Sequence, residues 1–140
     1  MQKYLKKFAL FYAITLIAIC LILIFIINLG ILTFVPVFVF SAFYTATQFV
    51  KTEKRLPTKE EKHVLVWGNT ALAIIIECFV IFFLVMLNPN AEKIIQTAEN
   101  IGLLGYAVIM LFLVALHSAV FFIAYRWISP RILKRYMSNI

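Results

Sequence analysis

Residues 64–87 read VLVWGNTALAIIIECFVIFFLVML, a run of 24 residues in which Glu77 is the only charged side chain. A helix needs about 20 mostly apolar residues to cross the hydrocarbon core of a bilayer. A run of this length with a single charge is typical of a transmembrane helix. We therefore predict that residues 64–87 span a membrane.

The four residues Thr58-Lys59-Glu60-Glu61, just before this run, have the pattern of a helix N-terminus. In a capping box the Thr hydroxyl accepts from the backbone N–H three residues on, and the Glu side chain there accepts from the Thr N–H. We expect the helix to begin in water near Lys59 and to enter lipid near Val64.

Three more apolar runs accompany the first, at about residues 8–28, 33–50 and 102–125. Pro36 is tolerated in the first turn of a helix, so the second helix should start at 33–35, after a hairpin at 29–33. Hydrophobic residues make up 64% of the chain and charged residues 14%, against about 45–50% and 25% in soluble domains. We predict an all-α membrane protein with a single domain, residues 1–140, in which four transmembrane helices form a bundle.

The run at 64–87 is followed by Asn88-Pro89-Asn90, which breaks the helix. In residues 91–101 the apolar side chains Ile94, Ile95, Ala98 and Ile101 share one helical face. The pattern predicts a short amphipathic helix in the second outer loop, lying on the membrane surface. A simple connector is the open alternative.

The distribution of cations predicts the direction of the spans. Twelve of the 13 Lys and Arg lie before residue 8, between residues 51 and 62, or after residue 125, and the remaining one is Lys93. Cytoplasmic segments carry the excess of Lys and Arg. We predict that both termini are cytoplasmic. The net charge of +7 then points to anionic headgroups of the bilayer as a partner, with other membrane proteins or further copies as candidates, and not to nucleic acid.

Glu77 and His117 are the two residues with candidate chemistry. Each lies ten residues outward from a tryptophan, Trp67 or Trp127, that suits the cytoplasmic interface. At 1.5 Å per residue both side chains should reach mid-membrane, about 15 Å from that belt. Ionisable groups at this depth are costly and usually pair. We predict an intramembrane polar pair, which either holds two helices together or responds to protons or cations.

Other polar and small residues are candidates for helix packing. Ser41, Tyr44, Thr45 and Gln48 form one stripe by their spacing, and Thr70 shares a face with Glu77, which makes these residues a candidate supporting polar face. Small residues bring membrane helices together, so Ala9 with Ala13, and Ala115 with Ser118 and Ala119, should mark contacts. Most Phe side chains should then face lipid.

Motifs for catalysis or cofactors are missing from the sequence. No phosphate loop, dinucleotide fingerprint, metalloprotease pair or serine elbow occurs. His63 should lie at a different depth from His117, which disfavours haem. We expect no enzyme, no cofactor and no metal site.

The stretch RLPTKEE at 55–61, followed by Trp67-Gly68, together with the length and the span pattern, resembles a family of short, uncharacterised four-span inner-membrane proteins of Gram-negative bacteria. The resemblance covers most of the chain. It implies a bacterial inner membrane and no particular activity.

Two classes of function stay open. The first is a structural, accessory or immunity-type protein of the inner membrane that acts by binding other membrane components. The alternative is a small transporter or channel coupled to protons or cations through Glu77. Small multidrug exporters are similar in size but carry their membrane glutamate in the first span, where this chain has none.

Overall fold

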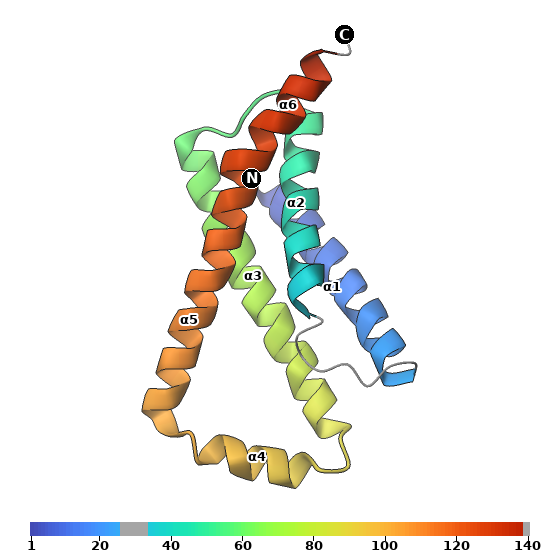
Figure 1. Cartoon of the computed structure of the whole chain (residues 1–140), viewed down its shortest axis with the longest axis vertical. Helices are drawn as coiled ribbons and strands as arrows, with labels where there is room; N and C mark the ends of the chain where they lie inside the picture. The colour runs from blue at the N-terminus through green and yellow to red at the C-terminus, as the bar shows by residue number, and fades with distance from the viewer. Residues whose placement is uncertain (26–33, 139–140) are drawn as a thin grey trace.

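The computed structural model describes residues 1–25 and 34–138, and every regular element in these residues is helical. Four long helices alternate in direction (Figure 1): α1 (Gln2–Phe25), α2 (Phe34–Glu53), α3 (Lys59–Met86) and α5 (Gly102–Ile123). The short helix α4 (Ala91–Glu99) joins α3 to α5. The predicted hairpin at 29–33 and the end of the predicted first span lie outside the described residues.

Three helical stretches of the described chain are long and apolar enough to cross a membrane: Gln2–Leu21, Lys59–Met86 and Gly102–Met137. The protein is therefore all-helical and has the features of a membrane protein. Helix α2 is not among the three stretches. It is 20 residues long, contains a stripe of polar side chains and ends in a charged turn with Lys51 and Glu53.

The start of α3 confirms the predicted capping box. The Thr58 hydroxyl accepts a hydrogen bond from the Glu61 N–H at 3.2 Å, and the Glu61 carboxylate accepts one from the Thr58 N–H at 2.9 Å. Arg55 adds an ion pair to the same carboxylate at 2.7 Å. Helix α3 begins at Lys59 because these contacts satisfy N–H groups that have no partner within the helix.

The C-terminal part is helical well beyond the predicted end of the fourth span. Helix α5 passes through a π-helical turn, η2 (Ala124–Ile128), into α6 (Ser129–Met137). Pro130 has no N–H to give to the carbonyl of Arg126, and its ring crowds that carbonyl. A wider turn before the proline relieves the clash, as π-bulges do within helices.

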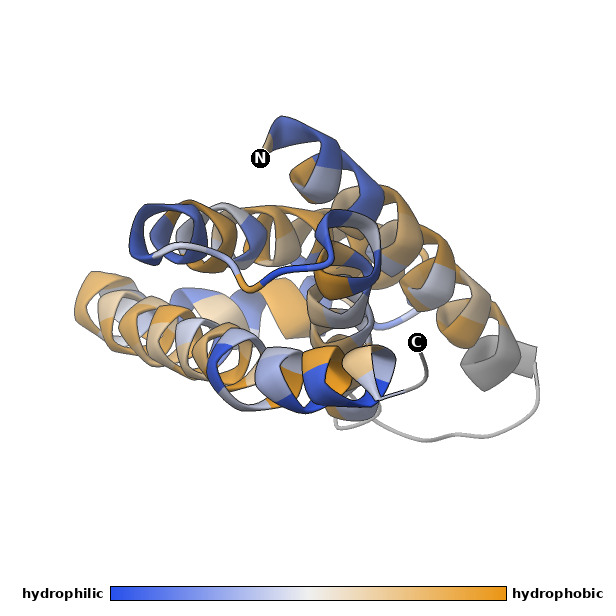
Figure 2. Cartoon of the chain, turned by 90° about the horizontal axis from the view of Figure 1, so that it is seen from above, coloured by the Kyte–Doolittle hydropathy of each residue, from blue (hydrophilic) through white to orange (hydrophobic). Residues whose placement is uncertain are grey.

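The two ends of the molecule differ in composition. Hydrophilic residues gather at the start of α1, in residues 54–58 between α2 and α3, and in α6 (Figure 2). These segments lie toward the same end of the molecule, here called the basic end, and α4 lies at the opposite end, here called the α4 end (Figure 1). Helices α3 and α5 diverge toward the α4 end.

Helix α1 packs through large side chains. Tyr4, Phe8, Tyr12, Leu16 and Cys20 recur every four residues and are all buried. Because positions four apart lie on one helical face, they form a continuous stripe against α2 and α3.

This stripe bears on two predictions about helix packing. Ala9 and Ala13 are only partly buried beside it. Four phenylalanines, Phe8, Phe38, Phe49 and Phe121, lie in the core, so these four are outside the majority of Phe side chains that is predicted to face lipid.

Candidate functional site

Glu77 on α3 and His117 on α5 are in direct contact. The Nε2 atom of His117 lies 3.0 Å from Oε1 of Glu77, and the two side chains are 5% and 13% exposed. Helices α3 and α5 pack against each other and run in opposite directions (Figure 1). The contact therefore joins two antiparallel neighbouring helices.

A third side chain, Tyr12 on α1, completes the group. Its hydroxyl donates a hydrogen bond to the same Oε1 atom of Glu77, and Tyr12 itself is fully buried. The carboxylate therefore ties together α1, α3 and α5. Sequence reasoning missed Tyr12, although its place in the four-residue spacing with Tyr4 and Phe8 was a usable signal.

Aromatic rings enclose these three polar groups. The ring of Phe38, on α2, lies 4.2 Å from the His117 ring between centroids, and 6.2 Å from the Tyr12 ring. Phe8 stacks on Tyr12 at 5.4 Å, and Phe121 meets both Phe8 and Phe38 edge-on. All four long helices thus contribute a side chain to the site. The aromatic rings give the polar groups surroundings with a low dielectric constant.

The backbone fixes which nitrogen of His117 carries a hydrogen. Nδ1 lies 2.8 Å from the carbonyl oxygen of Leu113, and a carbonyl can only accept, so Nδ1 is the donor. In a neutral ring Nε2 is then an acceptor, and its contact with Glu77 requires a protonated carboxyl. In a charged pair Nε2–H donates to the carboxylate. Either arrangement holds one proton between Glu77 and His117.

The residues of the candidate supporting polar face are not all buried in the structure. Ser41, Thr45 and Thr70 are buried, and the Thr45 hydroxyl donates to the Ser41 carbonyl at 2.8 Å. The hydroxyls of Ser41 and Thr70 have no hydrogen-bond partner among the described residues. Gln48 is partly buried, whereas Tyr44 is 36% exposed and stacks on Phe11 at 4.0 Å, so Tyr44 does not join this interior.

Two further polar contacts between helices were not expected from the sequence. Asn69 on α3 donates to the Tyr125 hydroxyl in η2 at 3.1 Å, and both residues are buried. At the basic end, Lys3 lies 2.8 Å from Oε1 of Glu53, and Tyr4 donates to the same oxygen. The Lys3 ammonium first, and then the Tyr4 hydroxyl, hold the pKa of the Glu53 carboxyl below its ordinary value of 4.5.

Metal-binding geometry does not occur in the part of the chain that the structure describes, where no three His, Cys, Asp or Glu side chains gather. Comparison of the chain with known protein families, with curated proteins and with solved structures found no match.

Proposed function

We propose that this chain is a four-span protein of a bacterial inner membrane, with both termini in the cytoplasm, that acts by binding other membrane components and not by catalysis. In this proposal the contact of Tyr12, Glu77 and His117 is a structural tie between helices. The observation that carries it is the engagement of one Glu77 oxygen by two buried partners. A cargo that bound to this oxygen would have to displace a buried partner.

The position of α2 supports a fourth crossing. Phe38 touches His117 and Tyr12, which lie well inside two stretches that are apolar enough to span a membrane. A helix packed among such helices at this depth has to share their apolar surroundings. Its polar side chains Ser41 and Thr45 are buried against its neighbours, as polar residues of membrane helices usually are.

The arrangement of cations supports the orientation. The start of α1, residues 54–58 and α6 share the basic end (Figure 1), and basic segments stay in the cytoplasm. Reporter fusions at Glu53 and at Ile140 should report a cytoplasmic location, and a fusion after Leu87 an external one. A cytoplasmic signal from α4 would contradict the four-span arrangement.

Proton coupling is the second candidate function. The observation in its favour is the proton shared by Glu77 and His117, which follows from the Leu113 contact. Intramembrane pairs of this kind occur in proton relays. A coupled transporter would have to release and reload this proton during each cycle.

Proton flux into proteoliposomes separates the two candidates. The variant Glu77→Gln keeps the size of the side chain and one oxygen that can accept from Tyr12, but it has no titratable proton to release. A structural tie predicts that wild type and Glu77→Gln conduct protons equally, at the rate of protein-free vesicles. Glu53→Gln is the matched control, since it removes a carboxylate at the basic end. Flux that is lost in Glu77→Gln but kept in Glu53→Gln would establish coupling and overturn the structural proposal.

A further inference from the structure

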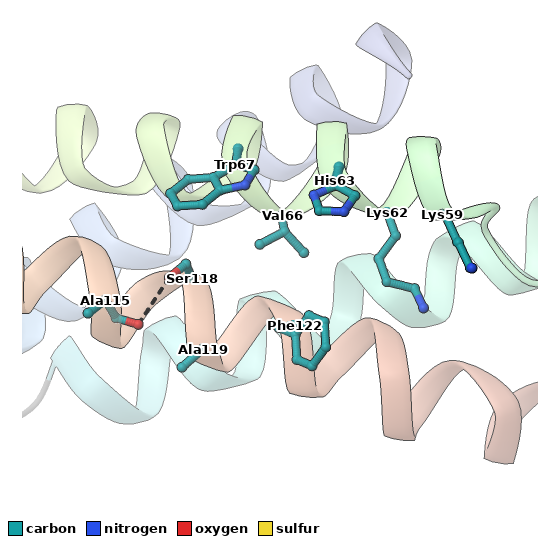
Figure 3. Close-up of a pocket in the computed structure, with 9 residues that line it drawn as sticks. All are labelled: Lys59, Lys62, His63, Val66, Trp67, Ala115, Ser118, Ala119 and Phe122. Atoms are coloured by element: carbon teal, nitrogen blue, oxygen red, sulfur yellow. Dashed lines mark hydrogen bonds between the residues drawn. The ribbon is translucent and has the colours of Figure 1, made fainter.

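A cavity of about 490 Å³ lies between α3 and α5 near the basic end (Figure 3). Sites for small ligands usually measure about 300–1,000 Å³, so the space is sufficient for part of a lipid. Its walls come from the first three turns of α3 and from the second half of α5: Lys59, Lys62, His63, Val66, Trp67, Ala115, Ser118, Ala119 and Phe122.

The lining changes from basic to apolar along the cavity. Lys59 and Lys62 lie at one end, and Trp67 and Ala115 at the other (Figure 3). Two acids, Glu60 and Glu61, stand between the lysines in the sequence. Glu61 is paired with Arg55, and Glu60 is exposed and, like Glu61, is not part of the cavity wall. The cavity thus offers positive charge at one end and an apolar surface at the other.

Small residues on α5 keep the cavity open. Ala115, Ser118 and Ala119, the predicted small-residue packing patch of α5, form part of its wall. The Ser118 hydroxyl donates to the Ala115 carbonyl at 3.1 Å, so its hydrogen is not available for a hydrogen bond to an occupant of the cavity. Trp67 and Phe122 remain 55% and 44% exposed, which leaves two large apolar surfaces for an occupant.

We propose that this cavity binds one anionic phospholipid. Its phosphate lies against Lys59 and Lys62. The part of an acyl chain nearest the headgroup lies along Trp67, Ala119 and Phe122. Basic pockets between membrane helices on the cytoplasmic side bind anionic headgroups. Tryptophan favours the depth where headgroup and chain meet. The order of charge and apolar surface along the cavity matches the order of headgroup and chain in a lipid.

Trp67 provides the test, because bromine on an acyl chain quenches a nearby indole. The full chain with Trp127→Phe keeps Trp67 as its single tryptophan. In detergent, brominated phosphatidylglycerol should quench Trp67 at a lower concentration than brominated phosphatidylcholine. A lysine at a membrane surface is worth roughly a fivefold gain in affinity for anionic lipid. The variant Lys59→Gln/Lys62→Gln should therefore need on the order of twentyfold more phosphatidylglycerol.

Two matched variants keep the result specific. Lys6→Gln/Lys7→Gln removes the same charge from exposed positions on α1 outside the cavity and should leave the quenching curve in place. Ala119→Phe fills the cavity without changing charge and should weaken quenching by phosphatidylglycerol even if the lysine variant does not fold.

Four outcomes would overturn the proposal. The first is equal quenching by both lipids, and the second is an equal loss in the α1 control. The third is release of the lipid by inorganic phosphate alone, which would indicate a soluble anion as the ligand. The fourth is a Trp67 that neither lipid reaches, which would indicate that protein covers the cavity.

Discussion

Helices α3 and α5 each have a packed half and an open half. In α3 the buried residues end at Ala73 on the way to the α4 end, and in α5 none occurs before His117. In the fold, α1 packs against α3, and α2 and η2 contact α5. Toward the α4 end the two helices diverge (Figure 1) and expose large apolar side chains such as Phe83 and Leu111.

The comparison shows where this protein relies on its own side chains and where it relies on lipid. Lipid is as apolar as a leucine side chain, so membrane helices associate through close packing and polar contacts. Polar contacts between helices occur in the packed half, at Asn69 with Tyr125 and at Lys3 with Glu53. The contact of Glu77 with His117 lies at the boundary, where it holds α3 and α5 together before they diverge.

The largest expected difference between the halves is a loss of packing. Leu65 is fully buried in the packed half, and Leu111 is 72% exposed in the open half. Leu65→Ala should cost about 2–5 kcal/mol because it leaves a cavity. Leu111→Ala should change stability by less than about 0.5 kcal/mol. Thermal unfolding in detergent compares the two, and equal losses would mean that the halves are packed alike.

A smaller and local effect is expected at the start of α3. Thr58→Ala removes the side-chain acceptor for the Glu61 N–H and should cost about 1 kcal/mol. Hydrogen exchange at Glu60 and Glu61 should speed up, while exchange near Met86 should not change. Unchanged protection at Glu61 would mean that the Arg55 contact alone fixes this turn.

Acidification should loosen the basic end only. The pKa of Glu53 is lowered in the folded protein by Lys3 and Tyr4, so its contribution is present above pH 4.5 and is lost as the pH falls through the lowered pKa. Hydrogen exchange in the first turn of α1, corrected for the intrinsic rate, should rise below pH 4.5. The variant Glu53→Gln should show the faster exchange already at pH 7. An acid response that persists unchanged in this variant would assign it to another group.

Local chemistry made some features predictable. The capping box at 58–61 is complete in the sequence, and it set the start of α3 without knowledge of any other helix. Pro36, in the first turn of α2, likewise marked the beginning of that helix. Pro130 carries the signal for the π-helical turn, although the apolar pattern alone predicts that the fourth span ends at about residue 125.

Features that depend on how the helices are rotated against one another were harder to predict. The depth of each residue along its helix places Glu77 and His117 at the same level of the membrane. Depth does not show which face of α1 meets them, so it does not predict the contact with Tyr12. The preference of membrane interfaces for small residues pointed to Ala9 and Ala13, whereas the buried face of α1 carries Tyr4, Phe8 and Tyr12. Asn69 was missed because a single amide in an apolar run does not reveal which neighbour it meets.

A double-mutant cycle on Glu77 and His117 tests the structural tie most directly. Glu77→Leu and His117→Leu should each lower thermal stability in detergent, and the double variant should lose less than the sum. The coupling should be about 0.6 kcal/mol and at most about 1.7 kcal/mol, as for other polar contacts between membrane helices. Glu77→Leu combined with Leu111→Ala, in the open half, is the additive control. Strict additivity of Glu77→Leu and His117→Leu would contradict the tie.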